Sequence, residues 1–453
     1  MAKANSSNTK HVCAQIEGIE YEETCAPTGA MVTLRLLLTI GISNGWEVHQ
    51  MDAKTAFLNS NLDEVIYLRS PLGLQLGPGK CYCLKKSIYG LQQSPRCWYK
   101  ELVSFFKKVN FSVSLTDSCL FISNNKEWPC LVHVHVDDMT IVSPDVSKFK
   151  TLISLAYDME DLGPIKHILG IKVTRDENHF YLSQTSMIEQ FLEEYGMKNS
   201  HAVKTPLEPG AYFSVASNEE QSAFNSLKLN YQRAIGLPNY LAVSTRPDLA
   251  FPVSILSQHL EKPGIQHWAG FKRILRYLAG TRTIGLQLAK ANFNLKVYAD
   301  ASYANCPNMR RSHTGLMVFL DDTLIHWKSR RQSTVSSTST EAEYKALYEG
   351  TQQILWFRKL FNDLSLVSSK FVLSLLGDNQ PAIAMAKNPV SSARTMHINI
   401  KFHWIREQLS KGLFHLDYVP TTEMHADLLT KALHRVKLPT FLSQAPIKSI
   451  PSV

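Results

Sequence analysis

One short stretch, residues 130–142 (CLVHVHVDDMTIV), constrains this chain more than any other. Apolar and polar residues alternate up to the adjacent Asp137 and Asp138, and a second apolar run follows. This pattern predicts two β-strands with two carboxylates at or near the turn that joins them. An ordinary acidic hairpin tip is one interpretation. Because two like charges beside buried strands are costly unless a cation neutralises them, a Mg²⁺ site is equally consistent with the stretch.

The overall composition limits the class of protein. A net charge of +9 and a pI of about 9.0 suit a protein that meets phosphate backbones, although many basic proteins do not. The eight cysteines are scattered without zinc-site spacing, which predicts reduced thiols in an intracellular protein. The most apolar run, Leu34 to Ile42, is interrupted by Arg35 and is too short to span a bilayer. We therefore expect no membrane role.

Another carboxylate and an aromatic helix precede the hairpin. Asp52 ends a predicted strand over residues 46–52, and the alternative for it is a helix N-cap or turn residue. Residues 87–99 (SIYGLQQSPRCWY) predict a loop that enters an aromatic-rich helix running to about Phe106. A plain capped helix with Pro95 in its first turn is the alternative there.

These three segments resemble, in kind and in order, the motifs of reverse transcriptases from copia-type LTR retrotransposons. The family's motifs are close to Leu-Asp-Val-Lys-Thr-Ala-Phe-Leu, Tyr-Gly-Leu-Lys-Gln-Ser-Pro-Arg-Ala-Trp and Tyr-Val-Asp-Asp-Met. They match residues 51–58, 89–98 and 135–139 of this chain. The resemblance extends from residue 11 to about residue 435. It implies an α+β multidomain fold with a reverse-transcriptase palm and fingers, a helical connection and then an RNase H-like mixed α/β domain.

The resemblance also implies a chemistry for these motifs. Asp52, Asp137 and Asp138 would hold two Mg²⁺ (or Mn²⁺) ions, which activate a primer 3′-hydroxyl and bind the triphosphate. Phe57 matches the aromatic position that crowds a ribose 2′-hydroxyl and so favours deoxynucleotides, and a core phenylalanine is the alternative. The implied partners are an RNA template, a DNA primer and deoxynucleoside triphosphates.

A second set of carboxylates is spread over the C-terminal part of the chain. Asp300 follows an apolar strand, Asp378 follows another, and Asp427 begins a predicted helix. Glu343 lies at the start of a helix, with the spacing of a capping box from Thr340. Taken singly, Glu343 could be a helix-start residue and Asp427 an acid favoured by the helix dipole, and each aspartate alone is weak evidence of a site.

Together, these four carboxylates resemble the active site of the RNase H fold. The resemblance implies two further Mg²⁺ (or Mn²⁺) ions, which would activate water against the RNA strand of an RNA–DNA hybrid. Two groups of basic residues are candidates for contact with the phosphate backbone, and a solvated basic surface is the alternative. They are Lys272, Arg273 and Arg276 on one predicted helix, and Lys328, Arg330 and Arg331 before the helix of Glu343.

The predicted organisation follows these motifs along the chain. A polar, disordered start precedes a reverse-transcriptase region with truncated fingers, and a stretch rich in proline, glycine and serine forms a linker. A helical connection follows, with Trp268, Phe271, Leu275 and Leu278 on one apolar face. An RNase H-like domain and a tail complete the chain. The predicted segments are residues 1–10, 11–198, 199–228, 229–292, 293–435 and 436–453.

The predicted function is that of an RNA-directed DNA polymerase with RNase H activity from a copia-type retrotransposon. Where the family carries a basic strand of the fingers, this chain has residues 9–14 (TKHVCA). We therefore expect polymerisation to be weaker than RNA cleavage. A non-enzymatic nucleic-acid-binding relic and a remnant with RNase H activity alone are the alternatives. The family's life cycle implies a cytoplasmic, particle-associated location.

Overall fold

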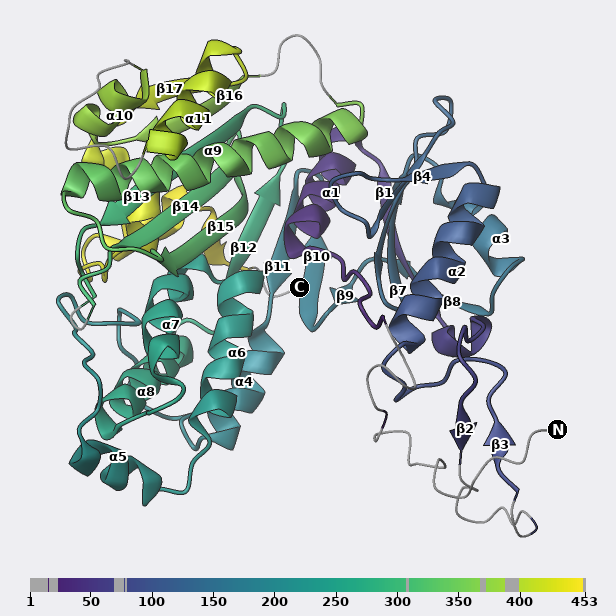
Figure 1. Cartoon of the computed structure of the whole chain (residues 1–453), viewed down its shortest axis with the longest axis horizontal. Coiled ribbons are helices and arrows are strands. Elements are labelled where there is room, and N and C mark those ends of the chain that lie inside the picture. Colours follow the sequence, from purple (N-terminus) through teal and green to yellow (C-terminus); the bar gives the residue numbers. More distant parts are fainter. Residues whose placement is uncertain are drawn as a thin grey trace. The chain divides into compact units, whose positions relative to one another are not determined.

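The computed structural model describes residues 15, 23–68, 77, 80–306, 309–366, 372–387 and 399–450, with the backbone alone for 399–402. The chain forms two compact units (Figure 1). The N-terminal unit contains residues 1–37 and 44–165, and the C-terminal unit contains residues 38–43 and 166–453. None of the described helices is both long and apolar enough to cross a membrane.

The N-terminal unit is built on a six-stranded antiparallel sheet in the order β4-β5-β6-β7-β1-β8. Its strands are β1 (Glu47–Ala53), β4 (Phe111–Val113), β5 (Leu120–Ser123), β6 (Leu131–His135), β7 (Asp138–Ser143) and β8 (Met159–Pro164). The remaining elements are η2 (Ala56–Asn59), β2 (Tyr67–Leu68), β3 (Tyr82–Cys83), α2 (Ser94–Lys108), α3 (Val146–Ser154) and α1 (Met31–Asn44), of which residues 38–43 are grouped with the C-terminal unit. The strand pair around residues 130–142 and the aromatic helix after residue 87 are thus both present.

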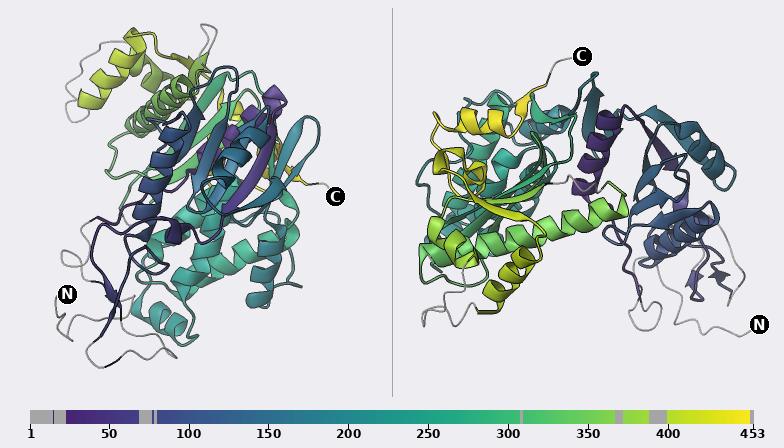
Figure 2. Two further views of the ribbon diagram at one scale, coloured as in Figure 1. Left: turned by 90° about the vertical axis from the view of Figure 1, so that its right-hand side faces the viewer. Right: turned by 90° about the horizontal axis from the view of Figure 1, so that it is seen from above.

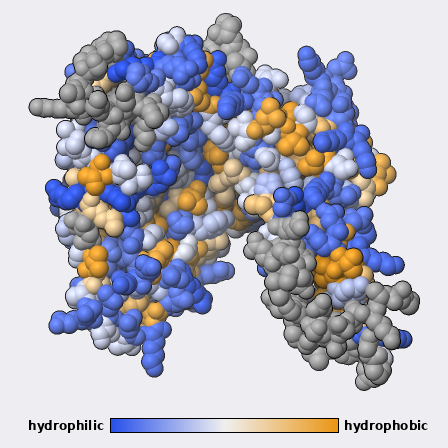
Figure 3. Space-filling model, viewed as in Figure 1, coloured by the Kyte–Doolittle hydropathy of each residue, from blue (hydrophilic) through white to orange (hydrophobic). Residues whose placement is uncertain are grey.

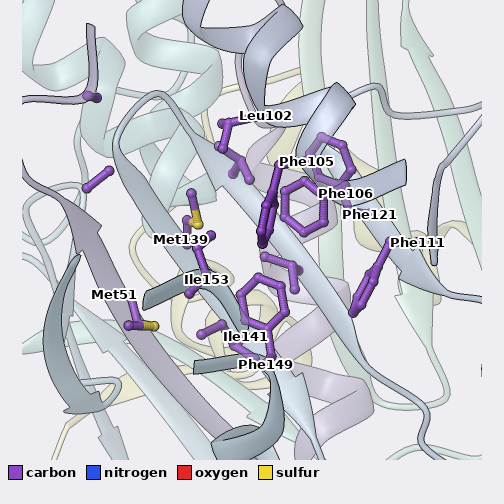
Figure 4. Close-up of a cluster of buried hydrophobic side chains, with 14 of the residues drawn as sticks. Met51, Leu102, Phe105, Phe106, Phe111, Phe121, Met139, Ile141, Phe149 and Ile153 are labelled. Carbon is purple, nitrogen blue, oxygen red and sulfur yellow. The ribbon is translucent and has the colours of Figure 1, made fainter. Parts of the chain in front are cut away.

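An aromatic core joins α2 and α3 to one face of this sheet (Figure 4). The ring of Phe106 stacks on Phe121 at 3.8 Å between centroids and on Phe149 at 5.7 Å. Met51 and Met139 face each other across β1 and β7 and lie in the same core. Because successive strand residues point to opposite faces, the next residues along these strands point away from the core.

Two sheets form the framework of the C-terminal unit. One is antiparallel with the order β18-β12-β11-β10-β9, and the other has the order β15-β14-β13-β16-β17. In the second sheet, β13, β14 and β15 are antiparallel neighbours, whereas β16 pairs in parallel with β13 and with β17. The long helix α9 crosses this mixed sheet (Figures 1 and 2). The mixed α/β architecture predicted for this part of the chain is confirmed.

The strands and the helices around them have the following bounds. The first sheet comprises β9 (His167–Ile168), β10 (Ile171–Arg175), β11 (His179–Ser183), β12 (Ile284–Ala289) and β18 (Ile447–Ser449). The mixed sheet comprises β13 (Leu295–Ser302), β14 (His313–Leu320), β15 (Thr323–Arg331), β16 (Leu373–Gly377) and β17 (His415–Tyr418). The later helices are α9 (Ser339–Asp363), α10 (Gln380–Lys387), α11 (Asn399–Ser410), the 3-10 helix η7 (His425–Leu429) and α12 (Leu438–Gln444).

A helical layer lies in sequence between β11 and β12 of the first sheet. It comprises α4 (Thr185–Glu194), α5 (Asn218–Asn225), α6 (Tyr231–Ser244), α7 (Ala250–Leu256) and α8 (Ile265–Gly280). The four residues of the predicted apolar face of α8 are all buried. Hydrophilic side chains predominate over this layer on the face shown in Figure 3, as expected for helices with one side in water.

Three predicted segments differ from what the structure shows. Residues 199–228 are not a loose linker, because they include α5 and the buried side chains of Leu207 and Phe224. The predicted tail contains β18, which pairs with β12, so the helical connection also contributes a strand. The compact units divide after residue 165, whereas the predicted domain boundary at residue 198 rests on family resemblance and stays a prediction. Residues 1–10 lie outside the described residues.

A fully buried ion pair holds the helical layer together. Arg246 donates to both oxygens of Asp248, with distances of 2.7 Å from Nη2 and 3.0 Å from Nε. Tyr277 on α8 donates to the same carboxylate, and Arg246 also donates to Thr281 beyond the end of α8. The pair therefore ties the chain after α6 to the C-terminal end of α8. A buried pair of this kind is costly to break, because the remaining charge is then buried without a charge of opposite sign beside it.

Replacing Asp248 with alanine should destabilise the chain by about 3–5 kcal/mol, since it leaves the Arg246 guanidinium buried without its carboxylate. Urea unfolding followed by circular dichroism measures this loss. The matched control is Glu194→Ala, which removes an exposed carboxylate 2.7 Å from Arg233 and should cost no more than about 1 kcal/mol. Equal losses in the two variants would contradict the role assigned to the buried pair.

His313 is a buried histidine in β14 that makes the C-terminal unit sensitive to acid. Burial, and then the charge of Arg331, lower its pKa to about 3. Its Nε2 lies 2.9 Å from the Ser329 hydroxyl. Because the unfolded chain takes up a proton near pH 6.5 and the folded chain does not, the contribution of His313 to stability is complete above pH 6.5. It is lost as the pH falls toward 3.

The variant His313→Gln should lack this acid-dependent loss. Below pH 6.5, the difference in unfolding free energy between the two chains should shrink by up to about 1.4 kcal/mol per pH unit, because only the chain with His313 loses stability by this route. Urea midpoints measured between pH 7 and pH 4.5 test this. Parallel pH profiles for the two chains would show that His313 does not titrate as described.

Candidate functional site

The β6–β7 hairpin places Asp137 and Asp138 at its tip. Val136 and Asp137 form the two-residue turn, and Val136 has φ +63°, which is strained for a β-branched residue. Two hydrogen bonds hold this turn. Trp98 Nε1 donates to the Val136 carbonyl at 2.8 Å, and the Ala53 N–H donates to the Asp137 carbonyl at 3.0 Å. The tip is therefore fixed both by α2 and by the strand that carries Asp52.

Asp52 lies beside this tip, on the face of the sheet opposite the aromatic core. It is directly opposite Asp138 on β7 and Glu160 on β8. Burial, and then the charges of Asp137, Asp138 and Glu160, raise the pKa of Asp52. The structure thus brings together the three carboxylates singled out in the sequence and adds Glu160 as a neighbour. Carboxylate oxygens grouped at neighbouring ends of β1 and β7 are of the kind that Mg²⁺ or Mn²⁺ prefers.

Gln50 supports this group, and no motif in the sequence indicated its role. Its side chain is 4% exposed, and its Nε2 donates to Asp138 Oδ1 at 2.9 Å. Gln50 precedes Asp52 by two residues, so both point to the same face of β1. This spacing was the available signal, but the bond to Asp138 depends on the register between β1 and β7.

Phe57 lies in the short helix η2 just after Asp52, and it is mostly covered. Its ring is 4.5 Å from the ring of Tyr89, with 56° between the planes. Burial, and then the charges of Asp137 and Asp52, raise the pKa of Tyr89, whereas a hydrogen bond from the Ala56 N–H opposes this shift. An aromatic pair thus borders the first carboxylate group.

A second group of carboxylates converges in the C-terminal unit. Asp300 lies in β13, Glu343 in the first turns of α9 and Asp378 directly after β16. One oxygen from each lies within 4.8 Å of the others, and no other such trio of acidic, histidine or cysteine side chains occurs in the part of the chain described. Three converging oxygen donors fit a divalent cation.

Burial gives these acids unusual proton affinities. Burial and the charge of Asp427 raise the pKa of Asp300 to about 7. Burial, and then the charges of Asp300 and Asp378, raise the pKa of Glu343 to about 9, although the Ala301 N–H donates to Glu343. Like charges in a desolvated site favour the protonated forms until a cation enters.

Asp427 approaches the same group from η7, a short 3-10 helix at the place where the sequence predicts a helix. Lys431 lies 2.7 Å from Asp427 Oδ1, and the Thr430 hydroxyl donates to Asp300 Oδ2 at 2.5 Å. Burial raises the pKa of Asp427 even though Lys431 opposes the shift. Sequence reasoning missed both partners, which follow Asp427 by three and four residues, a spacing that places them near it on a helix.

The start of α9 corrects one interpretation of Glu343. The N-cap is Thr338, whose hydroxyl accepts from the Glu341 N–H at 3.1 Å, so the capping box that was the alternative role for Glu343 does not form. Glu341 instead accepts from Ser337 and pairs with Lys345. The capping hydrogen bonds at the start of α9 therefore do not involve Glu343. Its carboxylate lies instead with those of Asp300 and Asp378.

The predicted backbone-binding residues have local partners in both groups. Lys328 and Arg330 pair with Glu349, Arg331 donates to Gln258, and all three basic residues lie in strand β15. On α8, Arg273 pairs with Glu208 and Arg276 donates to the His201 carbonyl, whereas Lys272 is exposed. These bonds account for part of the basic surface, and contact with nucleic acid stays a prediction.

Comparisons with known proteins support the sequence resemblance. Residues 5–209 match the family described as reverse transcriptase (RNA-dependent DNA polymerase). The chain is 37% identical over 433 residues to a retrovirus-related Pol polyprotein from transposon TNT 1-94 of Nicotiana tabacum, covering 93% of this chain and 32% of that protein. It is 32% identical over 443 residues to the Pol polyprotein from transposon RE1 of Arabidopsis thaliana, covering 96% of this chain and 30% of that protein. The chain therefore spans about a third of these relatives.

A shorter relative is matched along its whole length. A putative transposon Ty5-1 protein of Saccharomyces cerevisiae is 29% identical over 313 residues, which is 67% of this chain and all of that protein. Among solved structures, the RNase H1 of Halobacterium salinarum is 18% identical and covers 30% of this chain and 94% of its own, with a TM-score of 0.24.

Gln50→Leu should weaken cation binding at the first carboxylate group by about 10-fold or more, because Asp138 loses the donor that orients it. Mn²⁺ titration followed by electron paramagnetic resonance measures this affinity. The control Gln287→Leu changes a half-buried glutamine in the C-terminal unit and should leave the affinity unchanged. Unaltered Mn²⁺ binding in Gln50→Leu would show that Asp138 needs no such support.

Proposed function

Since the chain belongs to the reverse transcriptase family of copia-type transposon Pol polyproteins, we propose that it copies RNA into DNA and cleaves the RNA of the resulting hybrid. The observation that carries the proposal is the presence of two separate carboxylate groups, each assembled from distant parts of the sequence. A single acidic hairpin would suit many proteins, but two such groups in this order suit one polymerase and one nuclease.

In the proposed polymerase site, Asp52, Asp137 and Asp138 would hold two Mg²⁺ or Mn²⁺ ions. Bound cations would supply Lewis-acid activation of the primer hydroxyl and neutralise the triphosphate. The protein's own part is positional, because Gln50 orients Asp138 and Trp98 fixes the turn. Phe57 is proposed to limit the space at the sugar of the incoming deoxynucleoside triphosphate.

In the proposed nuclease site, Asp300, Glu343, Asp378 and Asp427 surround the cleaved phosphodiester and its cations. Thr430 holds the Asp300 carboxylate by a hydrogen bond. Substrate contacts are proposed for the exposed parts of two basic groups, which would meet the backbones of the RNA template, DNA primer and hybrid. These residues are Lys272, Arg273, Arg276, Lys328, Arg330 and Arg331.

Two other functions make different predictions. A nucleic-acid-binding relic would bind hybrid in a salt-dependent manner without either activity. A remnant with RNase H activity alone would cut RNA without extending a primer. The expected weakness in polymerisation depends on residues 9–14, which lie outside the described residues. A cytoplasmic, particle-associated location is proposed from the family's life cycle.

The test of the proposal measures both activities on one preparation. The intact chain with Mg²⁺ should extend a DNA primer on an RNA template and cut RNA within a hybrid. Asp137→Asn should lower extension by about 10³-fold or more and spare cutting, whereas Asp300→Asn should do the reverse, since each removes a carboxylate from one group only.

Circular dichroism of each variant separates lost chemistry from lost folding. Extension that survives in Asp137→Asn would exclude the assigned polymerase site, and cutting that survives in Asp300→Asn would exclude the nuclease site. Hybrid binding without either activity would favour the binding relic, and cutting alone would favour the RNase H remnant.

A further inference from the structure

A cavity of about 450 Å³ lies in the C-terminal unit, where the helical layer meets the mixed sheet. Helix α7 packs there against β15 and η7 (Figure 1). The cavity walls come from residues 210–215, from α7 and the residues after it, from the ends of β13 and β15, and from residues 430–432. A cavity of this size is typical of small-molecule binding sites.

The cavity shares a wall with the second carboxylate group. Thr430 lines the cavity, and its hydroxyl donates to Asp300 Oδ2 at 2.5 Å. Lys431 lines it as well and lies 2.7 Å from Asp427 Oδ1. Ser302, two residues after Asp300 in β13, is a third residue of this wall. A strand of nucleic acid held at the carboxylates therefore passes the mouth of the cavity.

Arg331 gives the cavity a cation without an acidic partner. It is half-buried at the end of β15, and its Nη1 donates to Gln258 Oε1 at 2.7 Å. Unlike the two other basic residues of β15, it forms no ion pair with any residue that the structure describes. Glu261 also lines the cavity, but it is exposed, so water and salt screen its charge. The guanidinium is thus available to a phosphate group.

Two flat rings also line the cavity. Tyr212 is 63% exposed although it belongs to the cavity wall. The ring of His259 stacks on that of His267, with 3.9 Å between the centroids and 16° between the planes. Burial, and then the charges of His267 and Arg331, lower the pKa of His259 to about 4, so its ring is uncharged at neutral pH. Flat, uncharged rings of this kind are surfaces on which unpaired nucleobases stack.

We propose that this cavity holds one unpaired nucleotide of the RNA strand, with its base against Tyr212 and His259 and its phosphate at Arg331. This inference rests on the proposed nuclease function and deepens it. The RNA strand is assigned because it is the strand that the carboxylates act on, and the cavity adjoins them. A base must leave the duplex to enter such a cavity, so the site favours the ends of a hybrid over its interior.

The test measures binding without cleavage. In the absence of divalent cations, fluorescence anisotropy compares a blunt RNA–DNA hybrid with hybrids that carry one unpaired nucleotide at the 3′ or the 5′ end of the RNA. One of these two ends should give about 10-fold tighter binding than the blunt hybrid, which is the scale of stacking one base. Only one end should do so, because the backbone runs through the site in one direction. An unpaired nucleotide on the DNA strand, or one on the RNA that lacks its base, should give no gain.

Variants of the cavity locate the gain. Tyr212→Ala should bring the affinity for the favoured hybrid down to that for the blunt one, whereas Tyr212→Phe should keep most of the gain because it keeps the ring. Arg331→Gln should also reduce the gain, since the phosphate loses its cation. The control Leu229→Ala changes an exposed apolar side chain of the same unit that does not line the cavity, and it should keep the whole gain. Circular dichroism checks that each variant is folded.

The outcomes separate this inference from the proposed nuclease. Equal binding of blunt and extended hybrids, or a gain that Tyr212→Ala keeps, would overturn the inference. An equal gain from the DNA strand, or from a nucleotide without its base, would also overturn it. A chain that cuts hybrids but shows no gain has the nuclease without the nucleotide cavity. A chain that shows the gain but cuts nothing has the cavity without the nuclease.

Discussion

Repulsion among partly buried carboxylates is the constraint on which both candidate sites depend. Burial and the charges of three neighbouring acids raise the pKa of Asp52. Burial, together with the charges of other acids, also raises the pKa values of Asp300 and Glu343. Such groups destabilise a fold unless its other contacts outweigh the cost. The aromatic core beneath β1 and β7, and the buried Arg246–Asp248 pair in the helical layer, are among those contacts.

The two sites solve the problem of holding like charges together by different means. The first uses two neighbouring strands inside one sheet, where the register places Asp52 opposite Asp138 and a strained turn at Val136 presents Asp137. The second collects side chains from β13, α9, the end of β16 and η7. Two of its acids are held by polar side chains: the Thr430 hydroxyl donates to Asp300, and Lys431 forms an ion pair with Asp427. Both arrangements leave carboxylate oxygens available to a cation.

The acidic residues could be found from the sequence because each follows or precedes an apolar strand or a helix start. Their supporting contacts could not, because these depend on register and on the exact helix boundary. Gln50 reaches Asp138 only in the observed pairing of β1 with β7, and the N-cap falls on Thr338 rather than Thr340. Similarly, local composition marked residues 199–228 as a linker, but Leu207 and Phe224 are buried, and the Phe224 ring packs against that of Trp268 in α8.

The same burial that crowds the second site also couples it to protons. With pKa values of about 7 for Asp300 and about 9 for Glu343, the site holds protons at neutral pH when no cation is bound. A divalent cation needs ionised oxygens, so its binding must release those protons, and its affinity must rise with pH over this range. Burial, and then the charges of neighbouring acids, also raise the pKa of Asp52. In both sites, burial and like charges therefore couple the binding of a cation to the release of protons.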